Sequence, residues 1–221
     1  MYLTILIPCL NESKTIGECI DDAFYFLHSH NIDGEVLVCD NGSEDDSCDI
    51  VIQHGARLVY CSAKGYGNAL RCGIADAKGE YIIFGDGDCS YDFRNLDGFV
   101  AAFQAGHEFV NGNRFRGGIE KGAMPFSHKL GVPVLSWLAK MKYKVPVYDF
   151  HCGLRGFKKS IFDTCMFTST GMEFATEIIA KANKYNMTEI PVKLRCDKRD
   201  GSPHLRTIRD GFRHFIYILK N

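Results

Sequence analysis

Short apolar runs alternate with segments of helical periodicity along the first half of the chain. The runs cover residues 3–7, 35–39, 57–61 and 81–84. Between the first two runs, apolar residues recur at three- and four-residue spacing from Ile16 to Leu27, which is the spacing of one face of an α-helix. Strands that alternate with helices are typical of βαβ units. The pattern therefore predicts an α/β fold with a mostly parallel central sheet flanked by helices.

The second half of the chain has a less regular pattern. We expect strands near residues 108–111, 151–157 and 188–194, and helices near residues 95–104, 130–143, 172–185 and 203–219. Residues 114–128 are rich in glycine and basic side chains and lack periodicity, so we expect a long loop over the site. No linker or change of composition divides the chain. We therefore expect a single domain covering residues 1–221.

Composition narrows the class of protein. Hydrophobic residues make up 46% and charged residues 24% of the 221 residues, with a net charge of -1, which is typical of a globular protein and not of a general nucleic-acid binder. The ten cysteines contain no Cys-x-x-Cys pair, which favours a reduced, cytoplasmic protein over a disulfide scaffold. The sequence contains no signal-peptide pattern and no run of about 18 apolar residues, so we expect no membrane-spanning segment.

A polar cluster follows each predicted strand of the first half. The clusters are residues 8–12, 40–45, 64–69 and 85–88. Ligands bind at the carboxyl ends of strands in an open α/β sheet. Asp86 and Asp88 supply the hard oxygen ligands that Mg²⁺ or Mn²⁺ prefers and commonly shares with substrate phosphates. Taken alone, this Asp-x-Asp segment fits a surface turn equally well, because Gly and Asp are both turn residues.

The other clusters have comparable alternatives. Asp40 is placed to accept hydrogen bonds from a nucleobase or ribose, with Leu10 to Glu12 packed beside the base, or it only closes a turn. Lys64 and Gly65 open a predicted helix, whose free N–H groups favour anions, or they only begin that helix. Ser43 and Asp46 resemble a capping box for a helix after the second strand.

The order of the four clusters resembles the family-2 glycosyltransferases of the glycosyltransferase-A fold. Those enzymes have a Pro-x-x-Asn-Glu turn, an Asp-x-Gly-Ser-x-Asp turn, a Lys-Gly helix start and an Asp-x-Asp metal motif, and this sequence has all four. The resemblance implies that Asp86 and Asp88 hold Mg²⁺ or Mn²⁺. It also implies a nucleotide-sugar site made by Pro8, Leu10, Asn11, Glu12, Asp40, Gly42, Ser43, Lys64, Gly65, Asp86, Gly87 and Asp88.

The resemblance continues into the second half. Segments 112–115, 149–155, 171–177, 199–202 and 210–214 resemble the branch that glycosylates polyprenyl or dolichyl phosphate. This branch implies an inverting, metal-dependent transfer of a sugar from a nucleotide sugar, with UDP-glucose favoured and GDP-mannose next, to that lipid phosphate. Residues 1–111 would then bind the nucleotide sugar and residues 112–221 the acceptor. Asp88, Arg114 and Arg199 would be the catalytic residues.

Two departures from that branch stand out. His204 replaces a usual lysine, and the sequence stops at Asn221, where relatives continue into membrane-spanning helices. The predicted last helix has an apolar side and interspersed arginines, which is typical of peripheral contact with an anionic membrane, although packing onto the domain explains the apolar side equally well.

Other functions remain open at this point. The same fold could act on a soluble or protein hydroxyl, with Glu173 or Glu177 as base, or could bind a nucleotide sugar without catalysis. A nucleotidyltransferase fits less well, because residues 8–12 are not a Gly-rich phosphate loop.

Overall fold

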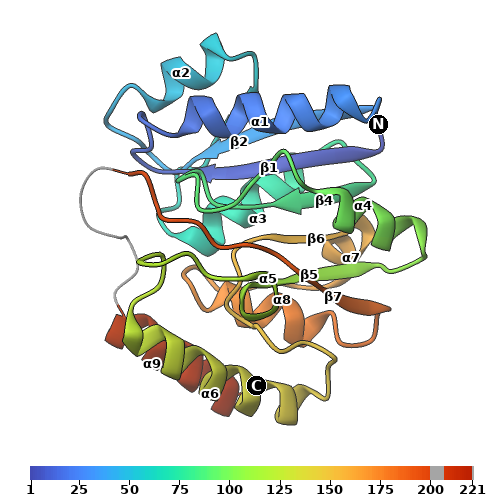
Figure 1. The fold of residues 1–221 in the computed structure, drawn as a ribbon, viewed down its shortest axis with the longest axis vertical. Helices are drawn as coiled ribbons and strands as arrows, with labels where there is room; N and C mark the ends of the chain where they lie inside the picture. The colour runs from blue at the N-terminus through green and yellow to red at the C-terminus, as the bar shows by residue number, and fades with distance from the viewer. Residues whose placement is uncertain (200–206, 221) are drawn as a thin grey trace.

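The computed structural model describes residues 1–199 and 207–220, and within it seven strands form one sheet in the order β3-β2-β1-β4-β6-β5-β7 (Figure 1). The strands are β1 (Leu3–Cys9), β2 (Gly34–Asp40), β3 (Arg57–Tyr60), β4 (Tyr81–Phe84), β5 (Phe109–Asn113), β6 (Arg155–Lys158) and β7 (Met187–Pro191). β6 runs antiparallel to both of its neighbours, and every other pairing is parallel. The predicted mostly parallel α/β sheet is confirmed.

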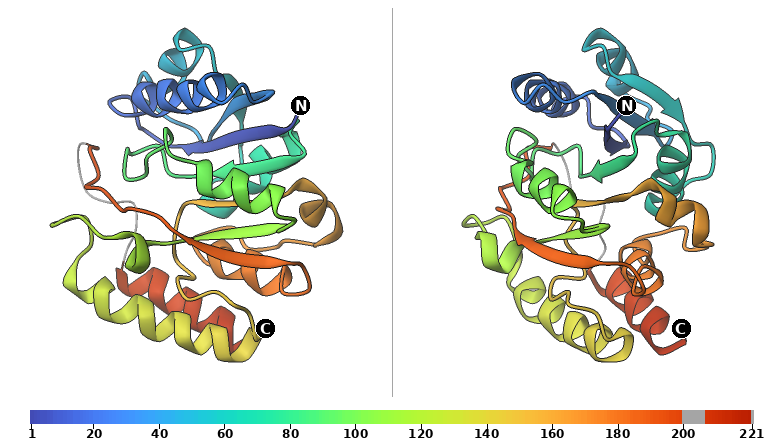
Figure 2. Two further views of the ribbon diagram at one scale, coloured as in Figure 1. Left: turned by 45° about the vertical axis from the view of Figure 1, so that its right-hand side comes forward. Right: turned by 90° about the vertical axis from the view of Figure 1, so that its right-hand side faces the viewer.

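Helices cover both faces of this sheet (Figure 2). The helices are α1 (Ile16–Ser29), α2 (Ser47–Gln53), α3 (Tyr66–Asp76), α4 (Asp97–Gln104), α5 (Arg114–Gly117), α6 (Phe126–Tyr143), α7 (Lys159–Thr164), α8 (Phe174–Lys181) and α9 (Thr207–Lys220). α6 and α9 lie side by side at the end of the molecule opposite α1 and α2. No helix in the described part of the chain is both long enough and apolar enough to cross a bilayer.

The central strand β1 supplies side chains to both hydrophobic cores. Leu3, Ile5 and Ile7 pack with α1 and α4 on one face, whereas Leu6 packs with α3 on the other. Every residue of β1 is buried, and its sequence is nearly continuously apolar, as is typical of a strand covered on both faces; its polar residue Thr4 is hydrogen-bonded to Glu35. This double burial fixes the carboxyl end of β1 in the middle of the sheet edge, where the candidate site lies.

Several local predictions were imprecise or wrong. Ser43 does not cap α2, because that helix begins at Ser47 without a side-chain cap and the Ser43 hydroxyl accepts the Asn11 amide instead. The expected loop at 114–128 contains the short helix α5 and the start of α6. The strand expected at 151–157 begins only at Arg155, since residues 149–153 form a turn held by side-chain contacts.

Candidate active site

The turns that follow β1 and β4 meet at the carboxyl edge of the sheet, because both strands are hydrogen-bonded neighbours. They bring together Glu12, Asp86 and Asp88, which we call the carboxylate cluster. Arg199, far along the chain, reaches into this cluster: its Nη2 lies 3.0 Å from Asp88 Oδ2 and its Nη1 lies 3.1 Å from Glu12 Oε1. Its Nη2 also lies 2.6 Å from Asp197 Oδ2. The structure therefore joins predicted site residues from both halves of the sequence.

The carboxylate cluster contains more carboxylates than nearby cations. Burial raises the pKa of Asp86 to about 7, and the charge of Asp88 adds to this rise, while Arg199 and Arg114 oppose it. Burial also raises the pKa of Glu12 to about 7, against the lowering effect of Arg199. Both shifts follow from placing carboxylates in a poorly solvated site near one another. Such a cluster favours a cation, and a guanidinium group occupies part of it.

The carboxylate of Asp86 is held from two sides. The hydroxyl of the partly buried Tyr66 donates to Asp86 Oδ1 over 3.3 Å. On the other side, a Cβ atom on Gly153 would lie 2.3 Å from Asp86 Oδ2, so only glycine fits there. Gly87 packs its Cα against Ile7, where a Cβ would come within 3.2 Å of a methyl carbon. Sequence reasoning missed Tyr66 and Gly153 as supports, although both belong to segments that carried the family resemblance.

The turn after β2 is closed by its own aspartate. Asp40 accepts the Gly42 amide at 2.8 Å and the Ser43 amide at 3.2 Å, and Gly42 has a φ of 89°. Lys64 Nζ donates to the Gly42 carbonyl over 3.0 Å. The turn-closing alternative for Asp40 thus has a structural basis, and Lys64 links the second and third clusters directly. These hydrogen bonds hold the turn in place and occupy part of the hydrogen-bonding capacity of Asp40 and Lys64.

Asn41 is a further support that the sequence did not reveal. Its amide nitrogen donates to the carbonyls of Cys61 and Ala63, and its Oδ1 accepts the Gly65 amide at 2.7 Å. Gly65 itself has a φ of 129°, and a Cβ there would lie 2.3 Å from the Thr170 carbonyl oxygen. The start of α3 is therefore fixed by backbone contacts that require glycine. The only sequence signal for Asn41 was its place inside the 40–45 cluster.

The turn after β1 is tied to the turn after β2. Pro8 and Leu10 flank Cys9, which pairs in register with Asp40. Asn11 Oδ1 accepts the Glu44 amide at 2.8 Å, and the Glu12 amide donates to Ser47 Oγ over 2.8 Å. The residues predicted to surround the base therefore form one connected surface. Each of these two bonds joins a backbone amide to a side-chain oxygen and so fixes one turn against its neighbour.

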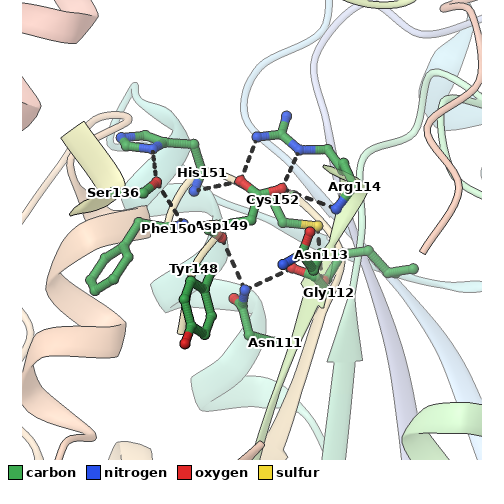
Figure 3. Close-up of polar contacts among 12 residues, drawn as sticks. Asn111, Gly112, Asn113, Arg114, Ser136, Tyr148, Asp149, Phe150, His151 and Cys152 are labelled. Atoms are coloured by element: carbon green, nitrogen blue, oxygen red, sulfur yellow. Dashed lines mark hydrogen bonds and ion pairs between the residues drawn. The ribbon is translucent and has the colours of Figure 1, made fainter. Parts of the chain in front are cut away.

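Arg114 occupies a different environment from Arg199. Its Nε and Nη2 donate to the two carboxylate oxygens of Asp149, each over 2.8 Å, and its backbone amide donates to Asp149 as well (Figure 3). Arg114 is 9% exposed and Asp149 is 0% exposed. This bidentate pair fixes the start of α5 relative to the turn before β6. Asp149 was part of a quoted sequence segment but was not predicted as the partner of Arg114.

The two glutamates of the α8 region are also bonded in place. Glu177 accepts amides from Thr168 and Ser169, and Glu173 accepts from Gly171 and Arg213. Burial raises the pKa of Glu173, but hydrogen bonds from backbone amides and Arg213 outweigh that effect and lower its pKa overall. A lowered pKa makes Glu173 a weaker general base. The predicted residues Gly201, Ser202 and His204 lie outside the described part of the chain.

Comparison with known proteins agrees with this geometry. Residues 4–166 match the family described as Glycosyl transferase family 2. The chain belongs to this family. The resemblance to family-2 glycosyltransferases seen in the sequence is therefore confirmed.

Two curated relatives from Haloferax volcanii illustrate the similarity. The low-salt glycan biosynthesis hexosyltransferase Agl6 is 34% identical over 99% of this chain, although the chain spans only 53% of the length of Agl6. A dolichyl-phosphate hexose transferase is 26% identical over 95% of this chain and 89% of its own length. Both are hexosyltransferases by name.

A solved structure shows the same fold. Glucosyl-3-phosphoglycerate synthase from Mycobacterium tuberculosis, in complex with Mn²⁺, UDP-glucose and phosphoglyceric acid, superposes with a TM-score of 0.77 at 19% identity. The match covers 99% of this chain and 78% of the other. The fold is thus of the glycosyltransferase-A type, as the sequence predicted.

Proposed function

We propose that this family-2 glycosyltransferase transfers a hexose, with inversion, from a nucleotide sugar to a polyprenyl or dolichyl phosphate. The observation that carries the proposal is the carboxylate cluster with Arg199 inserted into it, at the sheet edge where the first-half turns converge. The similarity to a dolichyl-phosphate hexose transferase over 95% of the chain supports the acceptor class. Residues 1–111 would bind the donor and residues 112–221 the acceptor.

A divalent ion fits the donor set of the cluster. Asp86 and Asp88 offer hard carboxylate oxygens, which suit Mg²⁺ or Mn²⁺. Among the described residues, no group of three or more His, Cys, Asp or Glu side chains is arranged to hold a metal alone, so the donor diphosphate would complete the coordination. When bound, the ion would act as a Lewis acid toward the leaving diphosphate. Mn²⁺ accompanies UDP-glucose in the structurally similar synthase.

A phosphate acceptor suits the residues around the site. Its second pKa is about 6, so it is largely ionised at neutral pH and needs no strong general base. Glu173 has a lowered pKa and is bonded to Arg213, which counts against a hydroxyl acceptor activated by this residue. Arg199 is the candidate to hold the acceptor phosphate near Asp88, and Arg114 would contribute by fixing the turn at Asp149.

Peripheral contact with the cytoplasmic face of a membrane is part of this proposal. On α9, Phe212 and Leu219 are exposed, and so is Lys220, which follows Leu219. Apolar side chains flanked by cations are typical of helices that lie on an anionic bilayer. Two residues of the predicted amphipathic side, Leu205 and Arg206, lie outside the described part of the chain.

Transfer assays test the proposal directly. Purified protein would be incubated with UDP-glucose or GDP-mannose, with Mg²⁺, Mn²⁺ or a chelator, and with a short polyprenyl phosphate. We expect a sugar-phosphate-lipid product that requires metal and forms faster with UDP-glucose. Equal transfer to a water-soluble alcohol would favour the hydroxyl-acceptor alternative, and donor binding without transfer to any acceptor would favour a nucleotide-sugar binding protein.

A further inference from the structure

α6 carries an apolar stripe that the rest of the described chain does not cover. Phe126, Leu130, Val134, Trp137 and Met141 recur at helical spacing, and each is between 58% and 75% exposed. Only Ser136 and Ala139 of this helix are buried. Such a contiguous row of exposed large apolar side chains marks a binding surface more often than a plain solvent face.

A pocket opens beside this stripe. It has a volume of about 500 Å³, and its walls come from α5, α6 and the segment before Asp149. The walls include Phe115, Pro133, Trp137, Lys140, Met141 and Tyr148. Volume and lining both match those of small-molecule sites, which are mainly apolar with a few polar groups.

The floor of the pocket leads toward the active site. Asn113 and Ser136 complete its lining, and Asn113 directly precedes Arg114. Ser136 Oγ accepts the Phe150 amide at 3.1 Å, next to the Asp149 carboxylate that binds Arg114 (Figure 3). From there, residues 149–153 continue to Gly153, whose backbone touches Asp86. One short, well-bonded segment therefore separates the pocket from the carboxylate cluster.

The charges around the pocket fit an anionic amphiphile. The sequence of α6 contains no acidic residue, its Lys140 lines the pocket, and the exposed Arg116 of α5 follows Phe115 of the pocket wall. Lys140 Nζ lies 3.1 Å from the centroid of the Tyr148 ring at the pocket wall, a cation–π contact that keeps its charge at the rim. A lipid phosphate combines an apolar chain with an anionic head, and the apolar walls and basic rim match these two parts.

We propose that the pocket between α5 and α6 binds the isoprenoid chain of the lipid phosphate acceptor, next to the phosphate group. This inference rests on the proposed function and adds where the chain of the acceptor lies. The apolar walls take the first isoprene units, and the exposed stripe of α6 guides the remainder of the chain away from the active site.

Trp137 provides a direct reporter, because it is the only tryptophan in the chain. Its emission would be recorded while adding farnesyl phosphate, inorganic phosphate, or phosphatidylcholine–phosphatidylglycerol vesicles that lack polyprenyl phosphate. We expect a saturable blue shift with farnesyl phosphate alone, because the exposed indole becomes covered by the chain. A shift with the vesicles but not with farnesyl phosphate would overturn the proposal and assign the α6 face to the bilayer itself.

A pair of matched variants localises the effect. Met141→Glu places a charge in the pocket wall, whereas Met166→Glu changes a still more exposed methionine outside it. We expect Met141→Glu to weaken farnesyl phosphate binding about tenfold, the effect of losing roughly two buried methylene groups, and Met166→Glu to leave it unchanged. Equal effects of the two variants would refute the chain site.

The outcomes for the chain site and for the proposed function are separable. Binding of farnesyl phosphate is measured by fluorescence in the absence of the sugar donor. A saturable shift without any sugar transfer would therefore contradict the proposed function and still support the pocket assignment. Conversely, transfer that is equally efficient for farnesyl phosphate and isopentenyl phosphate, and unaffected by Met141→Glu, would retain the function and remove the chain from this pocket.

Discussion

The protein contains two clusters of charged side chains with opposite properties. In the carboxylate cluster, Arg199 faces Glu12 and Asp88 and also pairs with Asp197, so negative charge is in excess. In the second cluster, which we call the closed cluster, Arg114 is paired one-to-one with Asp149, and the neutral rings of His151 and His214 pack alongside in an edge contact at 4.4 Å. The charges of the Arg114–Asp149 pair therefore balance without a ligand.

This difference separates a binding role from a structural one. A cation added to the carboxylate cluster is attracted by charge that Arg199 only partly neutralises. A charge added to the closed cluster meets a satisfied pair and two imidazoles whose pKa burial lowers. An arginine in a segment that resembles the family can thus either bind a ligand or hold the fold together. The number of carboxylates around the arginine decides between these two roles.

The largest effect should come from breaking the closed cluster. Arg114→Ala leaves the fully buried Asp149 without its counter-charge, and loss of one partner from such a pair costs about 3–5 kcal/mol. Chemical denaturation would measure this loss. Arg114→Lys keeps the charge but not the bidentate geometry, so its free energy of unfolding should lie between those of Arg114→Ala and the wild type. A loss below about 1 kcal/mol for Arg114→Ala would return Arg114 to the candidates for direct acceptor binding.

The sequence predicted the first half of the molecule better than the second. Strands 3–7 and 81–84 were predictable because strands buried on both faces have nearly continuous apolar sequences. β6 was placed several residues too early, because residues 149–153 are shaped by side-chain bonds between distant segments, such as the Tyr91 hydroxyl with the Gly153 amide. The hydrophobic periodicity of a segment does not indicate which distant residues its side chains and amides contact.

The candidate site shows the same limit. The Asp86 and Asp88 pair could be proposed from local sequence, because the two residues end one strand. The pairing of Arg114 with Asp149 could not, since the residues lie 35 positions apart and the choice between ligand and partner depends on burial. The exposure of the apolar side chains of α6 could not be predicted either, because their spacing resembles that of α1, whose apolar face is buried.

The next largest effect should come from a substitution in the carboxylate cluster, and it should change ligand binding and not stability. Asp88→Asn should weaken metal-dependent binding of UDP-glucose by about 100-fold, since a neutral amide is a poor partner for a divalent ion and a charged hydrogen bond contributes about 1.5–3 kcal/mol. Asn can still accept the Ser90 amide that Asp88 accepts, so stability should hold. Calorimetric titration with Mg²⁺ or chelator measures this, with Asp97→Asn, an exposed carboxylate on α4, as control. Unchanged affinity would remove Asp88 from the site.

A smaller effect is expected for Arg199. Arg199→Ala should raise the acceptor KM about tenfold, the equivalent of one charge-assisted hydrogen bond, while the donor KM changes less. The carboxylates left behind repel one another, so added Mg²⁺ should restore stability to this variant but not to Arg114→Ala. Steady-state kinetics with each substrate varied, together with unfolding curves with and without Mg²⁺, would measure both. A selective rise in donor KM would assign Arg199 to the donor half.

The smallest expected effect is a pH dependence of stability that arises in the closed cluster. The pKa of His214 is lowered to about 4, chiefly by burial and also by the charges of Arg155 and Arg213, while Glu173 opposes this shift. The Nδ1 atom of His214 lies 2.8 Å from Thr176 Oγ1. Because the unfolded chain accepts this proton near pH 6.5 and the folded chain does not, stability is full above that pH and falls as pH decreases toward 4.

Between pH 7.5 and 5.5 this histidine should therefore cost about 1 kcal/mol of unfolding free energy. His214→Gln keeps a polar group for Thr176 but cannot be protonated, so it should lose less stability over the same interval. His151, which faces His214 and also has a lowered pKa, remains in the variant and provides the baseline for comparison. If wild type and variant lose stability equally between these two pH values, His214 is not held neutral, and the closed cluster accepts charge as readily as the carboxylate cluster does.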